Sequence, residues 1–367
     1  MNVGDNYHGL KLLAYCGGGA YGEVFYCEDL THKKMAVKIL SKQKIGLHWR
    51  RELKGITNYR RLTIDATNLL KIYQVEEDED NFFYTMEAAD SLSQTEYKAD
   101  TLAARLEKGA LPDKDIFSVV SGIFEGIKTI HSAGFAHRDI KPDNILFVNG
   151  IPKLADLGLL SSLSATMTAL AGTFEFIPPE IRSSDNLYNC DNITRQKCDL
   201  YAFGKVIYCI ITGMDPLSFP SLPKNLSTSL PVKYFLRLSW KLCSHKSSTR
   251  LDDLAAVEKE ISFIEQKLLY GERWIDRFCY ALQQSQQNDK SIVTDITEMF
   301  HMKPRTLALV LAIITLAVLS SVISYDLRNQ LFKATQTGYL VLYFLFFWLC
   351  YYLLIDIILK IGRIFRK

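Results

Sequence analysis

The stretch His137-Arg138-Asp139-Ile140-Lys141-Pro142-Asp143-Asn144, followed by Asp156-Leu157-Gly158, decides the fold of this chain. It sets a carboxylate, a lysine, an asparagine and a second carboxylate at fixed separations. Transfer of a phosphoryl group needs a base for the incoming hydroxyl, a cation near the transferred phosphate and ligands for metal ions. Asp139 suits the base and Lys141 the cation. Asn144 and Asp156 suit the metal ligands. The alternative is a chance polar loop, and the length of the pattern argues against it.

A glycine-rich segment upstream extends the pattern. The run Gly17-Gly18-Gly19-Ala20-Tyr21-Gly22-Glu23-Val24 lies between the apolar residues Leu12-Leu13 and Val24-Phe25-Tyr26, which predicts a strand, a turn and a second strand. Glycine lets backbone amides approach phosphate oxygens, because no Cβ atom stands in the way. The next apolar stretch, Ala36-Val37-Lys38-Ile39, adds a lysine on a further predicted strand.

Together these motifs resemble those of eukaryotic-type (Hanks-type) protein kinases, over about residues 7–265. The resemblance implies an α+β, bilobal fold with a small β-rich lobe and a large helical lobe. It also implies ATP as substrate and Mg²⁺ or Mn²⁺ as the metal, with Asp139 and Lys141 as catalytic residues and Asn144 and Asp156 as metal ligands. The nucleotide-binding residues that it implies are Gly17, Gly18, Gly19, Ala20, Tyr21, Gly22, Val24, Ala36, Lys38, Glu52, Met86, Glu87 and Ala89.

Two of these assignments rest on position alone. The resemblance pairs Lys38 with the α- and β-phosphates and with a helix carboxylate, for which Glu52 is the candidate; Glu52 is alternatively an ordinary charge on a solvated helix. The stretch from Phe82 to Asp90 is similar to the strand that leads into the kinase hinge. There Met86 would border the adenine pocket, and the backbone of Glu87 and Ala89 would bind the adenine edge.

The stretch from Gly172 to Glu180 resembles the end of an activation segment. The resemblance implies that Glu180 is buried and paired with Arg250, because a buried carboxylate needs a partner. It also implies that Asp199 hydrogen-bonds the backbone near Arg138. Two positions depart from the family, where phenylalanine is usual at 157 and proline at 251; both carry leucine here. We expect these departures to alter activation control and not to abolish catalysis.

Lys141 and Thr173 are typical of the branch of the family that phosphorylates serine and threonine. The segment between Leu159 and Ala171 is rich in hydroxyls, and we hypothesise that Thr166 or Thr168 is autophosphorylated and pairs with Arg138. The alternative is a flexible polar loop that needs no phosphate.

Composition sets the outer bounds. The net charge of +3 over 367 residues gives no indication of a nucleic-acid partner. Eight cysteines without a C-x-x-C pair predict reduced thiols. The polar first residues predict no signal peptide. Helical periodicity is expected near 115–130 and 200–211.

The C-terminal part contains two uncharged runs, 306–325 and 334–355. A helix of ~20 apolar residues spans a bilayer, so both runs predict transmembrane helices; a buried hairpin in a soluble domain is the alternative. The predicted organisation is a kinase domain at 7–265, a juxtamembrane linker at 266–304, transmembrane helices at 305–325 and 334–359, a short non-cytoplasmic loop at 326–333 and a basic cytoplasmic tail at 360–367.

Basic residues flank the two runs on the outside, with Lys303 and Arg305 before the first and Lys360 and Arg363 after the second. This bias predicts that the kinase part and the C-terminus both face the cytoplasm. A bacterial inner membrane is favoured, and an intracellular eukaryotic membrane is the alternative. The expected partners are protein substrates, the lipid bilayer and, through the hairpin, a membrane protein or a second copy of the chain.

Two functions follow from these features. The first is a membrane-anchored serine/threonine protein kinase. The second is a catalytically weak, nucleotide-binding scaffold that recruits partners to the membrane. The complete set of catalytic polar residues favours the enzyme. Phosphorylation of a lipid or small molecule is less favoured, because Thr173 and the Pro-Pro-Glu ending resemble a peptide-binding segment.

Overall fold

The computed structural model describes residues 1–271, apart from residues 20, 157–173 and 183–191. The predicted membrane segments at 305–325 and 334–359, with the loop and tail beside them, lie outside the described residues. Within the described part, no helix is both long enough and apolar enough to cross a bilayer. The membrane prediction therefore stays a prediction.

The first part of the chain forms a six-stranded antiparallel sheet in the order β1-β2-β3-β4-β6-β5. Apolar residues alternate along its strands, so that Leu10 and Leu12 or Phe25 and Cys27 turn toward one buried cluster. The strands are β1 (Asn6–Tyr7), β2 (Leu10–Gly18), β3 (Gly22–Glu28), β4 (Lys34–Ser41), β5 (Ile72–Glu77) and β6 (Asn81–Met86).

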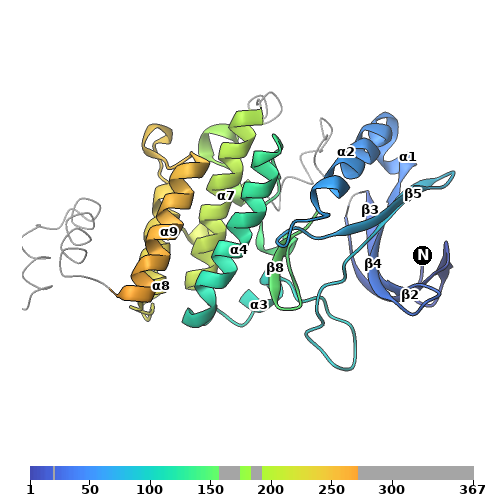
Figure 1. The fold of residues 1–367 in the computed structure, drawn as a ribbon, viewed down its shortest axis with the longest axis horizontal. Coiled ribbons are helices and arrows are strands. Elements are labelled where there is room, and N and C mark those ends of the chain that lie inside the picture. The colour runs from blue at the N-terminus through green and yellow to red at the C-terminus, as the bar shows by residue number, and fades with distance from the viewer. Residues whose placement is uncertain (20, 157–173, 183–191, 272–367) are drawn as a thin grey trace, which may run out of the picture. The chain divides into compact units, whose positions relative to one another are not determined.

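The connection from β4 to β5 is helical. It contains α1 (Lys42–Ile45), a turn of 3₁₀-helix, η1 (Gly46–His48), and α2 (Trp49–Leu62). The Ser41 hydroxyl accepts a hydrogen bond from the Lys44 amide and so caps α1. α2 buries Ile56 and Tyr59 in the main core. Figure 1 shows α2 along the outside of the sheet.

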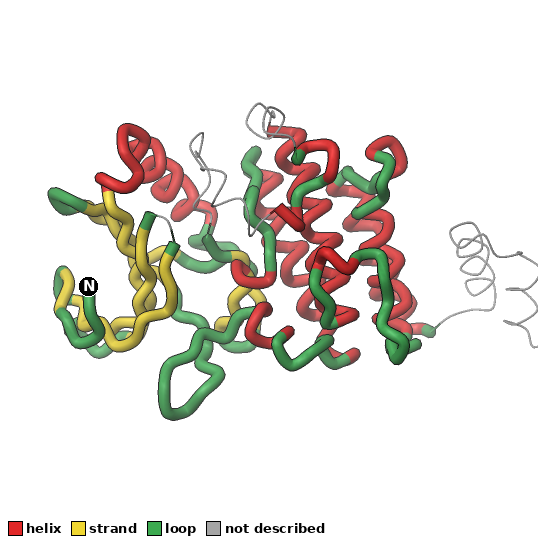
Figure 2. Tube along the Cα trace, turned by 180° about the vertical axis from the view of Figure 1, so that it is seen from behind, coloured by secondary structure: helices red, strands yellow, loops and turns green. Residues whose placement is uncertain are grey.

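The second part is helical. Along α4, the apolar residues Ile116, Val120, Ile123, Ile127 and Ile130 recur every three or four positions and are fully buried, as an amphipathic helix against a core requires. The helices α4, α7, α8 and α9 lie side by side in both views (Figures 1 and 2). The helices are α3 (Leu102–Leu106), α4 (Asp113–Ser132), α7 (Asn192–Thr212), α8 (Leu230–Leu242) and α9 (Leu254–Tyr270).

A two-stranded hairpin, β7 (Ile145–Val148) and β8 (Ile151–Leu154), connects the two parts. Leu154 exchanges backbone hydrogen bonds with the segment before β5: its carbonyl accepts from Leu70 at 2.9 Å, and its amide donates to Asn68 at 2.9 Å. Figure 2 shows the strands of the sheet at one end of this unit and the helices at the other. The predicted bilobal α+β fold is confirmed for the described residues, including the helices expected near 115–130 and 200–211.

Candidate active site

Asp139 lies in the catalytic loop, His137–Asn144, which follows α4 and ends in the 3₁₀ turn η2 (Pro142–Asn144). Its Oδ2 atom accepts a hydrogen bond from Asn144 Nδ2 at 2.8 Å and forms an ion pair with Lys141 Nζ at 2.9 Å. Its Oδ1 atom is buried and has no hydrogen-bond partner in the described part of the chain. Because a buried acceptor without a partner is costly, this oxygen is ready to accept a hydrogen bond from a bound hydroxyl.

The backbone of the loop is held from α7. The Asp199 carboxylate is buried and accepts hydrogen bonds from the amides of His137 and Arg138, each at 2.7 Å, and a third contact joins it to His131 Nε2 at 2.9 Å. Arg138 has a φ of 72°, in the left-handed region that non-glycine residues rarely adopt. The predicted contact of Asp199 with the backbone near Arg138 is confirmed, and it stabilises this uncommon conformation.

His137 links the loop to the strand that precedes Asp156. Its ring Nδ1 faces the Asp139 amide at 3.3 Å, and its Nε2 faces the Ala155 carbonyl at 3.1 Å. An amide donates and a carbonyl accepts, so Nδ1 carries no proton and Nε2 carries one. Burial lowers the pKa of His137, although the carboxylates of Asp199, Asp139 and Asp156 oppose the shift. His137 is therefore neutral, and its ring links the catalytic loop to the segment that carries Asp156.

Lys38 and Asp156 meet across the two lobes. Lys38 lies on β4, Asp156 follows β8, and the Lys38 amine donates a hydrogen bond to Asp156 Oδ1. Desolvation alone would lower the pKa of Lys38, but the nearby Asp156 charge overcomes it, and the pKa is raised. The Asp156 side chain is 41% exposed. Desolvation would raise its pKa, but the charge of Lys38 and the hydrogen bond from Lys38 hold that pKa below its usual value. Both groups are therefore charged.

Glu52 stands in the first turn of α2 and is half-buried. The structure gives Lys38 an ion pair with Asp156 and does not bring Lys38 into an ion pair with Glu52. The expected role of Glu52 thus stays a prediction.

The glycine-rich loop joins β2 and β3. The Gly19 amide donates to the Gly22 carbonyl at 2.9 Å, and the Ser41 amide donates to the Tyr21 carbonyl at 2.9 Å. A Cβ atom at Gly22 would lie 2.2 Å from the Ile39 carbonyl oxygen, so only glycine fits there. Gly17 pairs with Val24 in the hairpin. Ala20 lies outside the described residues, and Gly18 is exposed.

A pocket lies beside Asp156, between α2, the sheet and the segment that follows β8. Val24 lies opposite Lys38 in the sheet, and Ala36 lies opposite Met86. The pocket is lined by Ile56, Tyr59, Leu70, Ile72, Tyr84, Met86, Ala155 and Asp156. Met86 and Asp156 thus line one cavity, and their roles toward the adenine base and the phosphates stay predictions.

The hinge residues are fixed by contacts that the sequence does not reveal. The Glu87 carboxylate binds Lys153 Nζ at 2.8 Å and accepts from the Lys71 amide at 2.9 Å. The Ala89 carbonyl accepts a hydrogen bond from the Tyr97 hydroxyl at 3.0 Å. These contacts hold the main chain at 87–89, where the adenine contacts are expected.

A sequence model of the protein kinase domain matches residues 10–268, well over half of the chain. The chain belongs to the protein kinase family. It is 27% identical over 228 residues to the serine/threonine-protein kinase PrkC of Bacillus subtilis (strain 168), in a match that covers 59% of this chain and 32% of that protein. It is 26% identical over 234 residues to the serine/threonine-protein kinase cds1 of Schizosaccharomyces pombe (61% and 49%). The match therefore spans less than half the length of these relatives.

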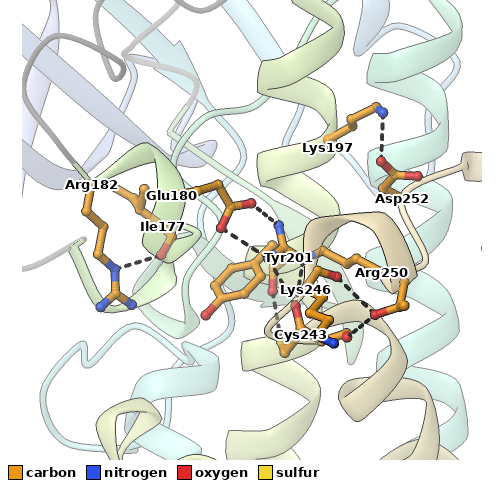
Figure 3. Close-up of polar contacts among 11 residues, drawn as sticks. Ile177, Glu180, Arg182, Lys197, Tyr201, Cys243, Lys246, Arg250 and Asp252 are labelled. Atoms are coloured by element: carbon orange, nitrogen blue, oxygen red, sulfur yellow. Dashed lines mark hydrogen bonds and ion pairs between the residues drawn. The ribbon is translucent and has the colours of Figure 1, made fainter.

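In this kinase fold the end of the activation segment is clamped to the large lobe. Arg250 donates to both Glu180 oxygens, with Nη2 to Oε2 at 3.2 Å, and its guanidinium lies 5.0 Å from the centre of the Tyr201 ring (Figure 3). The predicted pair is confirmed. The expectation that Glu180 is buried is wrong, because its side chain is 41% exposed while that of Arg250 is 6% exposed. The clamp buries the arginine and leaves the carboxylate at the surface. Leu157, Thr173 and the hydroxyls between 159 and 171 lie outside the described residues.

Sequence reasoning missed two tyrosines near the kinase pocket. Tyr84 is opposite Lys38 in the β4–β6 register, and burial, with the Asp156 charge, raises the pKa of Tyr84 to about 12. Tyr97 stacks on Tyr26, with ring centres 3.8 Å apart. Strand register and the path of a loop decide both contacts, and no motif marks them.

Proposed function

We propose that the chain is a membrane-anchored serine/threonine protein kinase that transfers the γ-phosphate of ATP to protein hydroxyls. The observation that carries this proposal is the state of Asp139: one oxygen is held by Asn144 and Lys141, and the other is buried without a partner in the described part of the chain. A fixed carboxylate with one open oxygen is what a residue needs to orient and deprotonate an attacking hydroxyl.

In the proposed reaction, the hydroxyl oxygen of the substrate forms a bond to the γ-phosphorus. The bond from that phosphorus to the β–γ bridging oxygen breaks, ADP leaves, and the hydroxyl proton passes to Asp139. Lys141, 2.9 Å from Asp139, is placed to neutralise charge on the transferred phosphate. Lys38 is charged and is placed to bind the α- and β-phosphates when they compete with Asp156 for its amine.

Asn144 and Asp156 would hold the metal. The described residues contain no cluster of three or more histidine, cysteine or acidic side chains suited to a metal. A site with one carboxylate and one amide fits an ion that keeps water and phosphate oxygens as further ligands, as Mg²⁺ does. Mn²⁺ fits the same donors. When bound, the metal ions would neutralise the phosphate charges and orient them.

The serine/threonine preference is supported by Lys141, two residues after the base, and by the similarity to serine/threonine-protein kinases. The test is transfer of labelled phosphate from ATP to a generic protein, followed by identification of the labelled amino acid. Phosphoserine and phosphothreonine are expected from the wild type, and Asp139→Asn should lower the rate by at least about 10²-fold. Equal transfer by the two proteins would leave only the scaffold function, and labelled tyrosine would overturn the specificity.

Membrane anchoring is supported by the two uncharged runs and by the basic residues that flank them. We place the kinase part and the C-terminus on the cytoplasmic side, with a bacterial inner membrane favoured. The full chain should stay with membranes through alkaline carbonate extraction, and a chain that ends before Lys303 should be released. Release of the full chain would overturn the proposal of membrane anchoring and would not bear on the proposal of kinase activity.

We also propose that the activation segment is autophosphorylated, at Thr166 or Thr168. The supporting feature is the density of hydroxyls between residues 159 and 171. Arg138, next to Asp139, is a cation with which a phosphate in this segment would pair. Mass spectrometry of the chain after incubation with Mg-ATP tests it. An active enzyme with no phosphate in this segment would overturn it.

A further inference from the structure

One face of α2 and the turns beside it form a row of exposed cations. The residues on α2 that point to solvent include Arg50, Lys54, Thr57 and Arg61, at spacings of four, three and four, which places them on one side of a helix. Lys44 precedes this row. Two exposed aliphatic side chains stand at its ends: Leu47, 97% exposed, in η1, and Ile64, 58% exposed, just after α2. We name Lys44, Leu47, Arg50, Lys54, Arg61 and Ile64 the basic stripe.

The cations of the basic stripe are not committed to protein carboxylates. Within the described part of the chain, the side chains of Lys44, Lys54 and Arg61 form no ion pair, and Arg50 lies over the Trp49 ring at 5.3 Å. The neighbouring Lys42 behaves differently, because it pairs with Glu77 at 3.0 Å. Among the described residues, no carboxylate pairs with Lys44, Lys54 or Arg61, so the stripe keeps its positive charge.

Along α2 itself, acidic residues do not offset this charge; the acidic turn at 76–80 lies beside α1, where Glu77 pairs with Lys42 and the Asp80 carbonyl accepts from the Lys42 amide. Between positions 42 and 65 the only acids are Glu52, which is half-buried on the opposite side of α2, and Asp65, which lies beyond the helix. The same segment contains seven lysines and arginines. The stripe therefore selects an anionic partner.

The shape of the stripe favours an extended anionic surface, and not a peptide, as its partner. A helix face is convex and offers no groove, and no described element covers the outer side of α2 in either view (Figures 1 and 2). Exposed aliphatic side chains at both ends of a cationic row fit a layer that is anionic at its surface and apolar beneath. A bilayer with acidic headgroups has this order.

We propose that the basic stripe docks the small lobe onto the anionic headgroups of the membrane in which the chain is anchored. This inference rests on the anchoring in the proposed function. Residues 272–305, which are 34 in number, separate the last described residue from the first uncharged run, and a chain of that length can span up to roughly 110 Å, so α2 can reach the same bilayer. Ile56 and Tyr59, on the buried side of the same helix, line the pocket beside Asp156, so docking of α2 would fix one wall of that pocket.

The test uses the full chain reconstituted in vesicles of phosphatidylcholine or of phosphatidylcholine with phosphatidylserine. An amine-reactive reagent labels the lysines, and mass spectrometry measures the rate at each. Lys44 and Lys54 should react at least about threefold more slowly on the anionic vesicles, and high salt should remove the difference. Lys114, exposed on α4, is the reference and should react equally on both.

A matched pair of variants separates the stripe from general charge. Arg50→Gln with Arg61→Gln should abolish the protection of Lys44 and Lys54. Lys11→Gln with Lys224→Gln removes the same charge from exposed positions off the stripe and should leave the protection intact. Thermal melting of each variant establishes that it is folded.

Two results would overturn the proposal. Equal labelling of Lys44 and Lys54 on both kinds of vesicle would show that lipid charge does not engage the stripe. Equal protection on neutral vesicles and in detergent would show that a protein surface covers it. Failure of the anchoring gives a different result, because the chain would then leave neutral vesicles on carbonate extraction. In that case, anionic vesicles would be added to the chain in solution, and the same lysine labelling would still test whether the basic stripe binds anionic lipid.

Discussion

The catalytic loop and the glycine-rich loop both carry motif residues of the protein kinase family, but they are stabilised in different ways. The catalytic loop is buried, and side chains fix it from within: Asp199 binds two of its amides, and Asn144 binds both the carbonyl and the carboxylate of Asp139. The glycine-rich loop is a hairpin with Gly18 and Gly19 exposed, held by strand pairing and by one hydrogen bond from Gly19 to Gly22. A proton acceptor must be rigid, whereas a phosphate cradle must admit its ligand.

The largest expected effect comes from releasing the rigid loop. In the wild type, the backbone amides of His137 and Arg138 donate to the Asp199 carboxylate. Asp199→Asn places an amide NH₂ group against these donors, so the catalytic loop loses hydrogen bonds that hold its backbone. We expect kcat to fall by about 100-fold and stability by roughly 2–3 kcal/mol, while KM for ATP changes little. Steady-state kinetics and thermal melting measure both. Unchanged kcat in a folded variant would show that the frame is not needed.

A pair of alanine substitutions tests the open loop. Gly22→Ala puts a Cβ atom 2.2 Å from the Ile39 carbonyl oxygen and should destabilise the small lobe by about 1–3 kcal/mol. Gly19→Ala meets no atom within 4 Å, so its stability should stay within about 0.5 kcal/mol of the wild type. If the loop amides hold phosphate, Gly19→Ala should nevertheless raise KM for ATP, by about tenfold, which corresponds to ~1.4 kcal/mol. A folded Gly19→Ala variant with wild-type KM would contradict this role of the loop.

The smallest effect concerns pH. Burial lowers the pKa of His137, so below the usual histidine pKa of about 6.5 the unfolded chain binds a proton that the folded chain does not. Stability should therefore fall as the pH drops below that value, by about 1 kcal/mol near pH 5.5. Melting temperatures across this range should show a shallower acid-side decline in His137→Gln than in the wild type. A folded His137→Gln variant with the wild-type slope would refute the assignment.

The two loops also differ in how far the sequence predicts them. Asp139, Lys141 and Asn144 lie within six residues, so their spacing already places them together, and the structure joins them by direct contacts. Lys38 and Asp156 are 118 residues apart, so their spacing does not place them together, and only the family resemblance predicts that they meet. The position of Tyr84 beside Lys38 depends on strand register, and the hydrogen bond from Tyr97 to Ala89 depends on a loop path. Local spacing encodes neither.

The surface features were harder to predict than the pocket. The pairing of Glu180 with Arg250 follows from the resemblance, but its exposure depends on how the end of the activation segment lies on the large lobe. The positive charge of α2 is visible in the sequence. Whether neighbouring carboxylates neutralise that charge depends on packing, and the described structure leaves Lys44 and Lys54 without such partners.

The central claim is that Asp139 and Asp156 serve one nucleotide in different ways, the first by accepting a proton and the second by binding the metal. The most direct test measures Mg-ATP binding and phosphate transfer side by side in Asp139→Asn and Asp156→Asn. We predict that Asp139→Asn binds Mg-ATP within about threefold of the wild type but transfers phosphate at least about 10²-fold more slowly. Asp156→Asn should lose Mg-dependent binding by at least about tenfold. Transfer at the wild-type rate by Asp139→Asn, or unchanged Mg-ATP binding by Asp156→Asn, would contradict the account.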